Sequence, residues 1–413
     1  MSRIVQGAGS KGRIAWSISP LLSGVTTAYQ VVSEGLRRAG WEVVGVTSGA
    51  DVPGGADPRC ADEFFEVLLP GCADVRRVAA EFVRWASDRR IDVVFSSGNM
   101  FTLAAAPALP PQVRFVSRCP SITRHSYALA VAVLPRTAQV VVETPRQQQD
   151  LIRDWAVPPE RCALIPGGVE VDKFNPGTLR DFRGGLRLIY LGRLDEASKG
   201  IMLLPVIATQ LVESKIEFHL DIVGDGPDGN RLKESLRRAN LRERVTLHGY
   251  LPRPEILPIL QRAHLFVLPS RYEGHSWALL ETMACGCVPI ASRIAGGTDF
   301  VVTQGANGAL CPVGKAGAFT REIVNLAADR NRLEAWSRAA REAIQGRFSL
   351  ERVVRDHDAL FTAVLAQAPP AFAPIPISQI QVPNMHGAGW RRFVPQPVKN
   401  YVRTWAERFG RTV

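Results

Sequence analysis

Hydrophobic and polar residues alternate along the chain with two different periods. Short runs rich in β-branched residues, typical of buried strands, alternate with longer segments in which apolar residues recur every three to four positions, as in amphipathic helices. In the first half, this pattern predicts strands at residues 13–17, 42–47, 93–96, 114–117 and 139–143, and helices at 26–39 and 75–89. Such alternation predicts a parallel sheet with helices on both faces.

The same pattern occurs again in the second half. It predicts strands at 187–191, 217–223, 244–247, 265–268 and 288–291, and helices at 203–213, 230–239, 255–262 and 278–285. Between the halves, proline and glycine cluster at 175–185 as in a linker. We therefore expect an α/β chain with two Rossmann-like, doubly wound domains, 1–175 and 176–349, that face each other across a cleft. Ligands are expected at the carboxyl ends of the strands.

The remaining residues, 350–413, are predicted to form an amphipathic helix at 350–365 and a tail. Residues 390–413 mix aromatic and basic side chains, and 398–409 would make an amphipathic helix. Such a helix could bind an anionic membrane surface, pack on the core or stay disordered. The sequence leaves these three alternatives open.

Length and composition narrow the class of protein. A chain of 413 residues with 46% hydrophobic and 22% charged residues suits an ordinary two-domain globular protein. No apolar run approaches the roughly 18–20 residues that span a bilayer, and the N-terminus lacks the apolar core of a signal peptide. Seven cysteines without a Cys-x-x-Cys pattern favour reduced thiols over a zinc site or disulfides. We therefore expect a cytoplasmic protein.

The chain carries 50 basic and 39 acidic residues, a net charge of +11. This charge is compatible with nucleic acid, an anionic membrane or an anionic substrate as partner. The sequence contains no helix-turn-helix, zinc-finger or aromatic-sheet motif, which argues against nucleic acid.

Residues 266–292 hold the densest candidate chemistry. A predicted buried strand leads into a loop with Glu273, and Glu281 follows on the next helix with seven residues between them. The start of that helix would point backbone N–H groups at a phosphate, and the carboxylates could accept hydrogen bonds from sugar or ribose hydroxyls. Either glutamate alone could be an ordinary surface residue. Glu281, however, lies between Leu280 and Met283 on a helix whose other residues are apolar, which favours a functional role.

Two cations, Arg193 and Lys199, follow the predicted strand 187–191. Both would lie at the carboxyl end of the sheet, where a ligand is expected. A sugar donor's diphosphate carries about two negative charges that need stabilisation while the leaving group departs, and arginine and lysine provide it. The alternative is a pair of solvated loop cations.

These segments resemble the family-four retaining glycosyltransferases of the GT-B architecture. Residues 266–292 resemble the family's Glu-x7-Glu signature, and 188–200 resemble its first C-domain strand with the basic pair. Similar segments at 165–176, 220–227 and 245–250 extend the resemblance, in the family's order, from about residue 165 to 365, whereas the N-terminal half matches loosely.

The resemblance implies transfer of a sugar, with retention of configuration, from a nucleoside-diphosphate donor to a hydroxyl of a glycan, a glycolipid or another acceptor. Cell-surface polysaccharide or glycoconjugate synthesis is the expected setting. In such enzymes the departing phosphate oxygen takes the acceptor's proton, so no cofactor and no essential metal are expected. Two alternatives stay open, a nucleotide-sugar epimerase of the same architecture and a catalytically silent module that binds sugar or nucleic acid.

The resemblance also assigns roles to residues. Glu281 would bind the donor ribose, Glu273 would contact the transferred sugar, and Arg193 and Lys199 would hold the diphosphate. The remaining donor-side candidates are the loop and helix start Gly274, His275, Ser276 and Trp277, the turn glycine Gly224, the base neighbours Tyr250 and Leu251, and Gly24 in the N-terminal half. Gly224 and Gly24 could equally be plain turn residues.

One feature departs from the family pattern. Many relatives place a histidine after the fourth N-domain strand, close to the reacting sugar, whereas this chain has Arg118 there and His125 seven residues later. Either His125 or Arg118 could take that place, and His275 is a further candidate for the sugar pocket. The donor sugar, the base, the acceptor and the linkage stay open.

Overall fold

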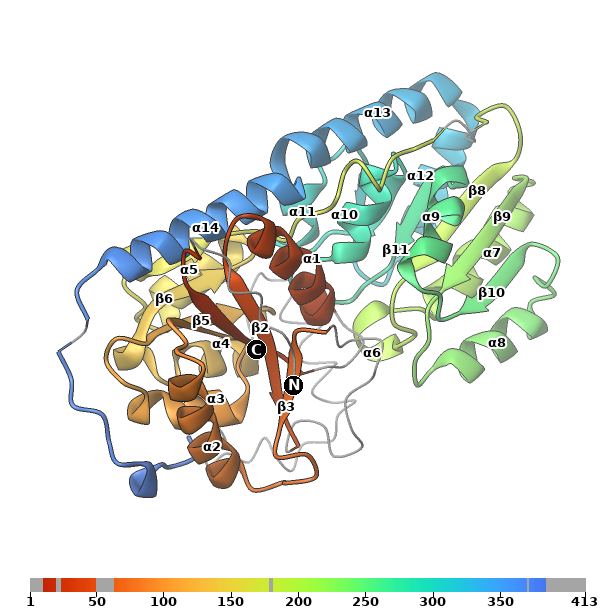
Figure 1. Cartoon of the computed structure of the whole chain (residues 1–413). Coiled ribbons are helices and arrows are strands. Elements are labelled where there is room, and N and C mark those ends of the chain that lie inside the picture. The colour runs from red at the N-terminus through yellow and green to blue at the C-terminus, as the bar shows by residue number, and fades with distance from the viewer. Residues whose placement is uncertain (1–9, 20–23, 50–62, 178–180, 370, 384–413) are drawn as a thin grey trace. The chain divides into compact units, whose positions relative to one another are not determined.

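The computed structural model describes residues 10–19, 24–49, 63–177, 181–369 and 371–383. The chain forms two compact units (Figure 1). Of the described residues, those at 10–168 and 350–383 belong to unit 1, and those at 169–349 belong to unit 2. Each unit is built on one parallel sheet, which confirms the predicted fold class of two Rossmann-like α/β domains. The predicted tail, 390–413, lies outside the described residues.

Unit 1 has a seven-stranded sheet in the order β3-β2-β1-β4-β5-β6-β7. Its strands are β1 (Arg13–Ser17), β2 (Glu42–Ser48), β3 (Phe65–Leu68), β4 (Val93–Ser96), β5 (Arg114–Cys119), β6 (Thr137–Val142) and β7 (Cys162–Leu164). Its α-helices are α1 (Gly24–Arg38), α2 (Val75–Asp88), α3 (Met100–Ala105), α4 (Arg124–Val131), α5 (Pro145–Asp154) and α14 (Leu350–Ala366). Short 3-10 turns occur at η1 (Ala106–Ala108), η2 (Leu134–Arg136), η3 (Pro159–Arg161) and η4 (Ile377–Gln379).

Helix α14 belongs to unit 1 although it follows unit 2 in the sequence. It packs along α1 (Figure 1), where a Cβ added to Gly35 would lie 2.3 Å from Val354 Cγ2, so the close approach requires glycine. Beyond α14 the chain returns to the opposite side of the sheet. There Ile375 donates its backbone N–H to the carbonyl of Pro107, and Ile380 is buried in the core beside α2.

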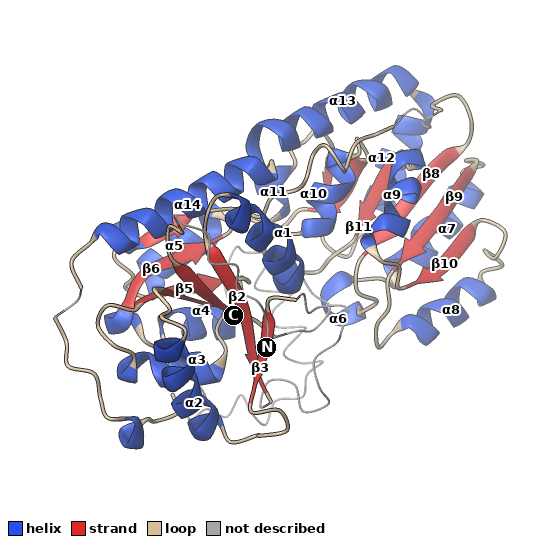
Figure 2. Cartoon of the chain, in the orientation of Figure 1, coloured by secondary structure: helices blue, strands red, loops and turns tan. Residues whose placement is uncertain are grey.

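Unit 2 has a six-stranded sheet in the order β10-β9-β8-β11-β12-β13. Figure 2 shows strands β11, β8, β9 and β10 of this sheet side by side. Its strands are β8 (Leu186–Leu191), β9 (Phe218–Val223), β10 (Val245–Gly249), β11 (Leu265–Leu268), β12 (Val288–Ser292) and β13 (Ala309–Cys311). Its helices are α6 (Glu196–Lys199), α7 (Leu203–Glu213), α8 (Gly229–Arg238), α9 (Arg253–Arg262), α10 (Trp277–Ala284), α11 (Thr298–Val301), α12 (Ala316–Ala328) and α13 (Arg330–Arg347).

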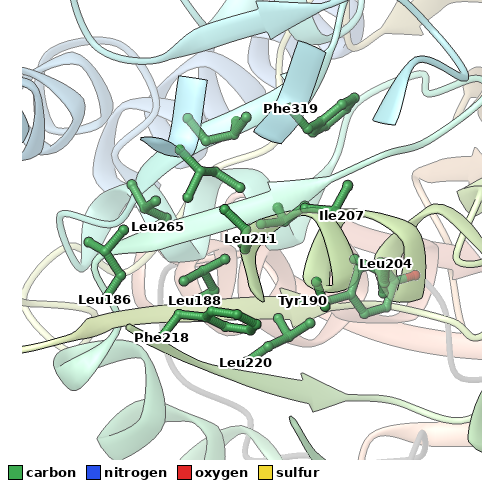
Figure 3. Close-up of a cluster of buried hydrophobic side chains, with 14 of the residues drawn as sticks. Leu186, Leu188, Tyr190, Leu204, Ile207, Leu211, Phe218, Leu220, Leu265 and Phe319 are labelled. Carbon is green, nitrogen blue, oxygen red and sulfur yellow. The ribbon is translucent and has the colours of Figure 1, made fainter. Parts of the chain in front are cut away.

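The core of unit 2 lies on both faces of this sheet. On one face, side chains of β8, β9 and β11 pack against α7 and α12, with Tyr190, Leu211 and Phe319 among them (Figure 3). On the other face, Ile189 and Phe266 pack with residues of α10 and α13. Because both faces are covered, the central strands are apolar at nearly every position, as buried parallel strands are.

The order of the strands in unit 2 reverses between β8 and β11. Strands β9 and β10 extend the sheet on one side of β8, and β12 and β13 extend it on the other side of β11. At such a switch point the connections leave in opposite directions, and the carboxyl ends of the two strands border a space where ligands of α/β proteins bind. The chain that follows β8 and β11 is therefore where a site is expected.

Candidate active site

The segment after β8 is fixed in place. Asp195 caps the one-turn helix α6, and its carboxylate accepts hydrogen bonds from the backbone N–H of Ala197 at 2.9 Å and from Ser198 Oγ at 2.8 Å. Gly200 ends the helix with φ of +61°, and a Cβ there would lie 2.4 Å from the carbonyl oxygen of Pro269. Lys199, the last residue of α6, therefore projects from a closed turn.

Lys199 pairs with Glu273, which lies in the loop after β11. Its Nζ is 2.5 Å from Glu273 Oε1, and Ser270 Oγ donates to the same oxygen at 2.8 Å. Glu273 is only 7% exposed, so the alternative that it is an ordinary solvated loop residue does not hold. The switch point thus holds a cation from the β8 side and a carboxylate from the β11 side in contact.

Arg193, the other predicted diphosphate ligand, lies two residues after the end of β8. Its side chain is exposed, while its backbone carbonyl accepts a hydrogen bond from the buried Tyr190 hydroxyl at 2.8 Å. Tyr190 therefore fixes the backbone at Arg193 and leaves the guanidinium in solvent.

The loop from Gly274 to Ser276 leads into α10. Ser276 caps the helix, and its Oγ accepts a hydrogen bond from the backbone N–H of Leu279 at 3.4 Å. Trp277 is buried. The imidazole of His275 is also buried, and its ring centroid lies 5.9 Å from that of Phe348. The structure therefore places the His275 ring in an aromatic cluster at the base of the loop.

Glu281 is buried in α10, as its apolar neighbours predict. It is 7% exposed, and Arg253 Nη2 of α9 donates to its Oε1 at 2.6 Å. Burial raises the pKa of the Glu281 carboxyl above its ordinary value, the positive charge of Arg253 opposes that shift, and the negative charge of Glu170 adds to it. Arg253 was not singled out in the sequence because it lies 28 residues before Glu281 and in no recognisable motif.

The other donor-side candidates lie at the ends of β9 and β10. Gly224 directly follows β9 and packs against Gly192, which directly follows β8. Tyr250, just beyond β10, is 39% exposed, and Leu251 is half-buried. The close packing of Gly224 against Gly192 therefore explains why a glycine stands in this turn, as the plain-turn alternative for Gly224 proposes.

The close approach of Gly224 to Gly192 predicts the effect of placing alanine at position 224. A Cβ at Gly224 would lie 1.9 Å from the carbonyl oxygen of Gly192, and φ there is +139°. Gly224→Ala should lower the free energy of unfolding by more than about 3 kcal/mol, since both the contact and the backbone conformation disfavour a side chain. Chemical denaturation measures the loss. Gly346→Ala is the control, because a Cβ there meets nothing within 4 Å on helix α13, and it should stabilise by about 0.5–1 kcal/mol. Equal stability of the Gly224→Ala variant and the wild type would contradict the close approach.

In unit 1, His125 and Arg118, the two candidates for the place of the family's N-domain histidine, have different environments. His125 lies exposed on the first turn of α4, whereas Arg118, near the end of β5, is 4% exposed and pairs with Glu143 at 2.5 Å. Nη1 of Arg118 has no hydrogen-bond partner among the described residues. Gly24 is the exposed first residue of α1.

No three His, Cys, Asp or Glu side chains within the described ranges gather closely enough to hold a metal ion. The sequence contains one Asp-x-Asp triplet, residues 356–358, and it lies within α14. There Asp358 accepts hydrogen bonds from Lys11 Nζ and from Trp41 Nε1, both at 2.8 Å, so this carboxylate ties α14 to the start of unit 1.

Comparison with known proteins assigns the family. The model of glycosyltransferase family 4 matches residues 22–173, and the model of glycosyl transferases group 1 matches residues 180–343. The chain belongs to the family-four glycosyltransferases. The two matches fall on the two halves of the chain and leave residues 174–179 between them, which overlap the start of the predicted linker at 175–185.

Individual relatives are more distant. The chain is 28% identical over 220 residues to WcaL of Escherichia coli, which is named as a putative colanic acid biosynthesis glycosyltransferase. This match covers 52% of the present chain and 54% of WcaL. It is 20% identical over 260 residues, 63% of this chain and 69% of the relative, to the N-acetylgalactosamine-N,N'-diacetylbacillosaminyl-diphospho-undecaprenol 4-alpha-N-acetylgalactosaminyltransferase of Campylobacter jejuni. The match to WcaL thus spans about half the length of that protein.

Solved structures share the fold of this chain. Anabaena HepE in complex with UDP superposes with a TM-score of 0.70 at 17% identity, over 85% of this chain and all of HepE.

Among the described residues of the glycosyltransferase, no helix is both long and apolar enough to cross a bilayer.

Proposed function

We propose that this glycosyltransferase is a retaining enzyme that moves a sugar from a nucleoside-diphosphate donor to a hydroxyl acceptor, with the donor bound by unit 2. The observation that carries the proposal is the contact between Lys199 and Glu273 at the β8/β11 switch point. A cation and a carboxylate held there can serve the two parts of such a donor, its diphosphate and its sugar hydroxyls.

Each residue has a distinct part in the proposed reaction. Lys199 and the exposed Arg193 stabilise the negative charge that develops on the leaving diphosphate. Glu273 accepts hydrogen bonds from the sugar and Glu281 from the ribose, while the start of α10 presents backbone N–H groups to the donor. The departing phosphate oxygen takes the acceptor's proton, so the two glutamates are not a glycosidase acid and nucleophile pair. No metal or cofactor is part of the proposal.

The acceptor is proposed to be a glycan or a lipid-linked sugar in cell-surface polysaccharide or glycoconjugate synthesis. Two relatives support this choice by name, since one belongs to colanic acid biosynthesis and the other acts on a diphospho-undecaprenol-linked sugar. HepE, whose structures hold UDP and UDP-glucose, supports a nucleotide donor. An epimerase would release free sugar from the same donor, and a silent module would release none.

Thermal unfolding with UDP, GDP and ADP tests the donor site. A nucleotide that binds only the native state at a hundredfold excess over Kd should stabilise it by about 2.7 kcal/mol. We expect one of the three to raise the Tm of the wild type, and Arg193→Ala and Glu281→Ala to lose the shift. Arg242→Ala is the control, because Arg242 is exposed between α8 and β10. If no nucleotide raises the Tm, the donor site is wrong and a silent module becomes the better explanation.

A further inference from the structure

Four side chains of unit 2 are linked to the carboxylate of Glu281, either by contacts or through their charge. Arg253 is the first residue of α9. Glu170 and Phe174 come from the segment between β7 and β8, and Lys173 of the same segment pairs with Glu170 at 2.6 Å. Glu281 thus has one cation in direct contact and one carboxylate near enough to repel its charge.

The guanidinium of Arg253 is held from two directions. Nη2 donates to Glu281 Oε1 at 2.6 Å, and the guanidinium carbon lies 4.9 Å from the centroid of the Phe174 ring. Phe174 is buried in the core, so the ring is a fixed surface for this contact. The side chain of Arg253 is still 29% exposed, which leaves the pair open to solvent on one side.

A third feature of Arg253 is the environment of its Nε–H. Its Nε–H is buried and has no hydrogen-bond partner among the described residues. Buried donors without a partner are rare in native proteins and need a specific explanation, because each lowers stability. The stacking on Phe174 and the hydrogen bond to Glu281 fix the orientation of the guanidinium. This orientation satisfies the carboxylate of Glu281 and leaves the Nε–H without an acceptor among the described residues.

We propose that Arg253 is a positioning residue that holds the Glu281 carboxylate in the charge state and orientation that accept hydrogen bonds from the donor ribose. The inference rests on the proposed function, because it takes Glu281 as the ribose ligand. Arg253 thereby makes recognition of the ribose hydroxyls depend on α9, an element outside the segment that carries both glutamates.

The electrostatics of the cluster agree with this role. Burial and Glu170 both raise the pKa of Glu281, and Arg253 is the group that lowers it. Lys173 pairs with Glu170, and Arg341 of α13 donates to the backbone carbonyls of Ala284 and Phe174. Without Arg253 the pKa of Glu281 would rise further, and its carboxyl would be protonated more readily as the pH falls. A protonated carboxyl has lost acceptor capacity for a ribose diol.

The test compares ribose and deoxyribose nucleotides on the full chain. The nucleoside diphosphate that stabilises the wild type, and its 2′-deoxy and 3′-deoxy forms, are titrated by calorimetry at about pH 8 and about pH 6. The wild type should bind the ribose form about 10- to 100-fold more tightly, as expected for a hydrogen bond to a charged group. Arg253→Met should reduce this preference to less than about threefold, and its affinity for the ribose form should fall with pH. Arg253→Lys, which keeps the charge, should be intermediate.

Three further variants separate positioning from a general loss of structure. Glu281→Gln should lose the ribose preference without pH dependence, and the Arg253→Met/Glu281→Gln double variant should bind no more weakly than Glu281→Gln alone. Arg262→Met is the matched control, an exposed arginine on the same helix, and should behave as wild type.

The outcomes distinguish the two proposals. A wild type that binds no nucleotide overturns the proposed function. A wild type that binds while Arg253→Met keeps the full ribose preference overturns the role of Arg253 alone, as does additive loss in the double variant. If Arg253→Met does not fold, a full ribose preference in Arg253→Lys and in Arg253→Gln overturns it instead.

Discussion

Lys199→Met is expected to slow release of the nucleoside diphosphate from the sugar donor by about 10²- to 10³-fold, the loss typical when one charge-stabilising group is removed from a transition state. Lys199 projects from the capped turn of α6 with its Nζ in contact with Glu273. The donor is the nucleotide sugar whose base raises the Tm of the wild type, and the assay follows release of the diphosphate with a membrane extract as acceptor.

The same substitution should also destabilise the fold, and the two effects can be separated. Removal of Lys199 takes the paired cation from the buried Glu273 and leaves the hydroxyl of Ser270 as a donor to its carboxylate, and breaking a buried pair costs about 3–5 kcal/mol. The Lys199→Met/Glu273→Gln double variant removes the stranded charge and should recover most of the stability but none of the activity. Lys233→Met, on the exposed face of α8, should change neither. Recovery of activity together with stability would mean that Lys199 serves the fold and not the reaction.

The fold was predictable where the hydrophobic signal is long. Each predicted strand and helix that falls within the described residues is present, with bounds that differ by at most two residues, whereas the predicted helix 398–409 lies outside them. The strands β3, β7 and β13 were missed because they are three or four residues long and lie at the edges of the sheets, where little apolar sequence is needed. Helix α12 was missed although Phe319, Ile323 and Leu326 follow a helical spacing, so a signal was present there.

The site was predictable only in part because its contacts join distant segments. The strand pattern placed Lys199 and Glu273 at carboxyl ends of the sheet, but their pairing, across 74 residues, depends on β8 and β11 being neighbours. The burial of His275 between aromatic rings depends on Phe300 and Phe348, which lie far along the chain. Local sequence identifies which residues follow a strand, whereas the order of the strands decides which of them meet.

The second large effect is expected in unit 1. Arg118→Met should lower the free energy of unfolding by about 3–5 kcal/mol, because it strands the buried carboxylate of Glu143, whose side chain is 5% exposed. Glu143→Gln should cost a similar amount by stranding the guanidinium. Replacing both, as Arg118→Met/Glu143→Leu, should return stability to near the wild-type value, since apolar pairs of similar volume often substitute for buried ion pairs. Urea denaturation measures the free energy of unfolding of all three variants. A double variant as unstable as the single ones would contradict the explanation that each single variant is unstable because it leaves one buried charge unpaired.

The double variant also decides between Arg118 and His125 as the residue that stands in for the family's histidine. Because it is expected to fold, its transfer activity reports on chemistry and not on stability. Loss of activity in Arg118→Met/Glu143→Leu, with full activity in His125→Ala, would assign the role to Arg118. The reverse pattern would assign it to His125, which is exposed on α4 and can be removed without disturbing the core. Arg118 holds one buried N–H without a partner among the described residues, and such a donor is more readily explained by a substrate group than by the fold alone. We therefore expect the first pattern.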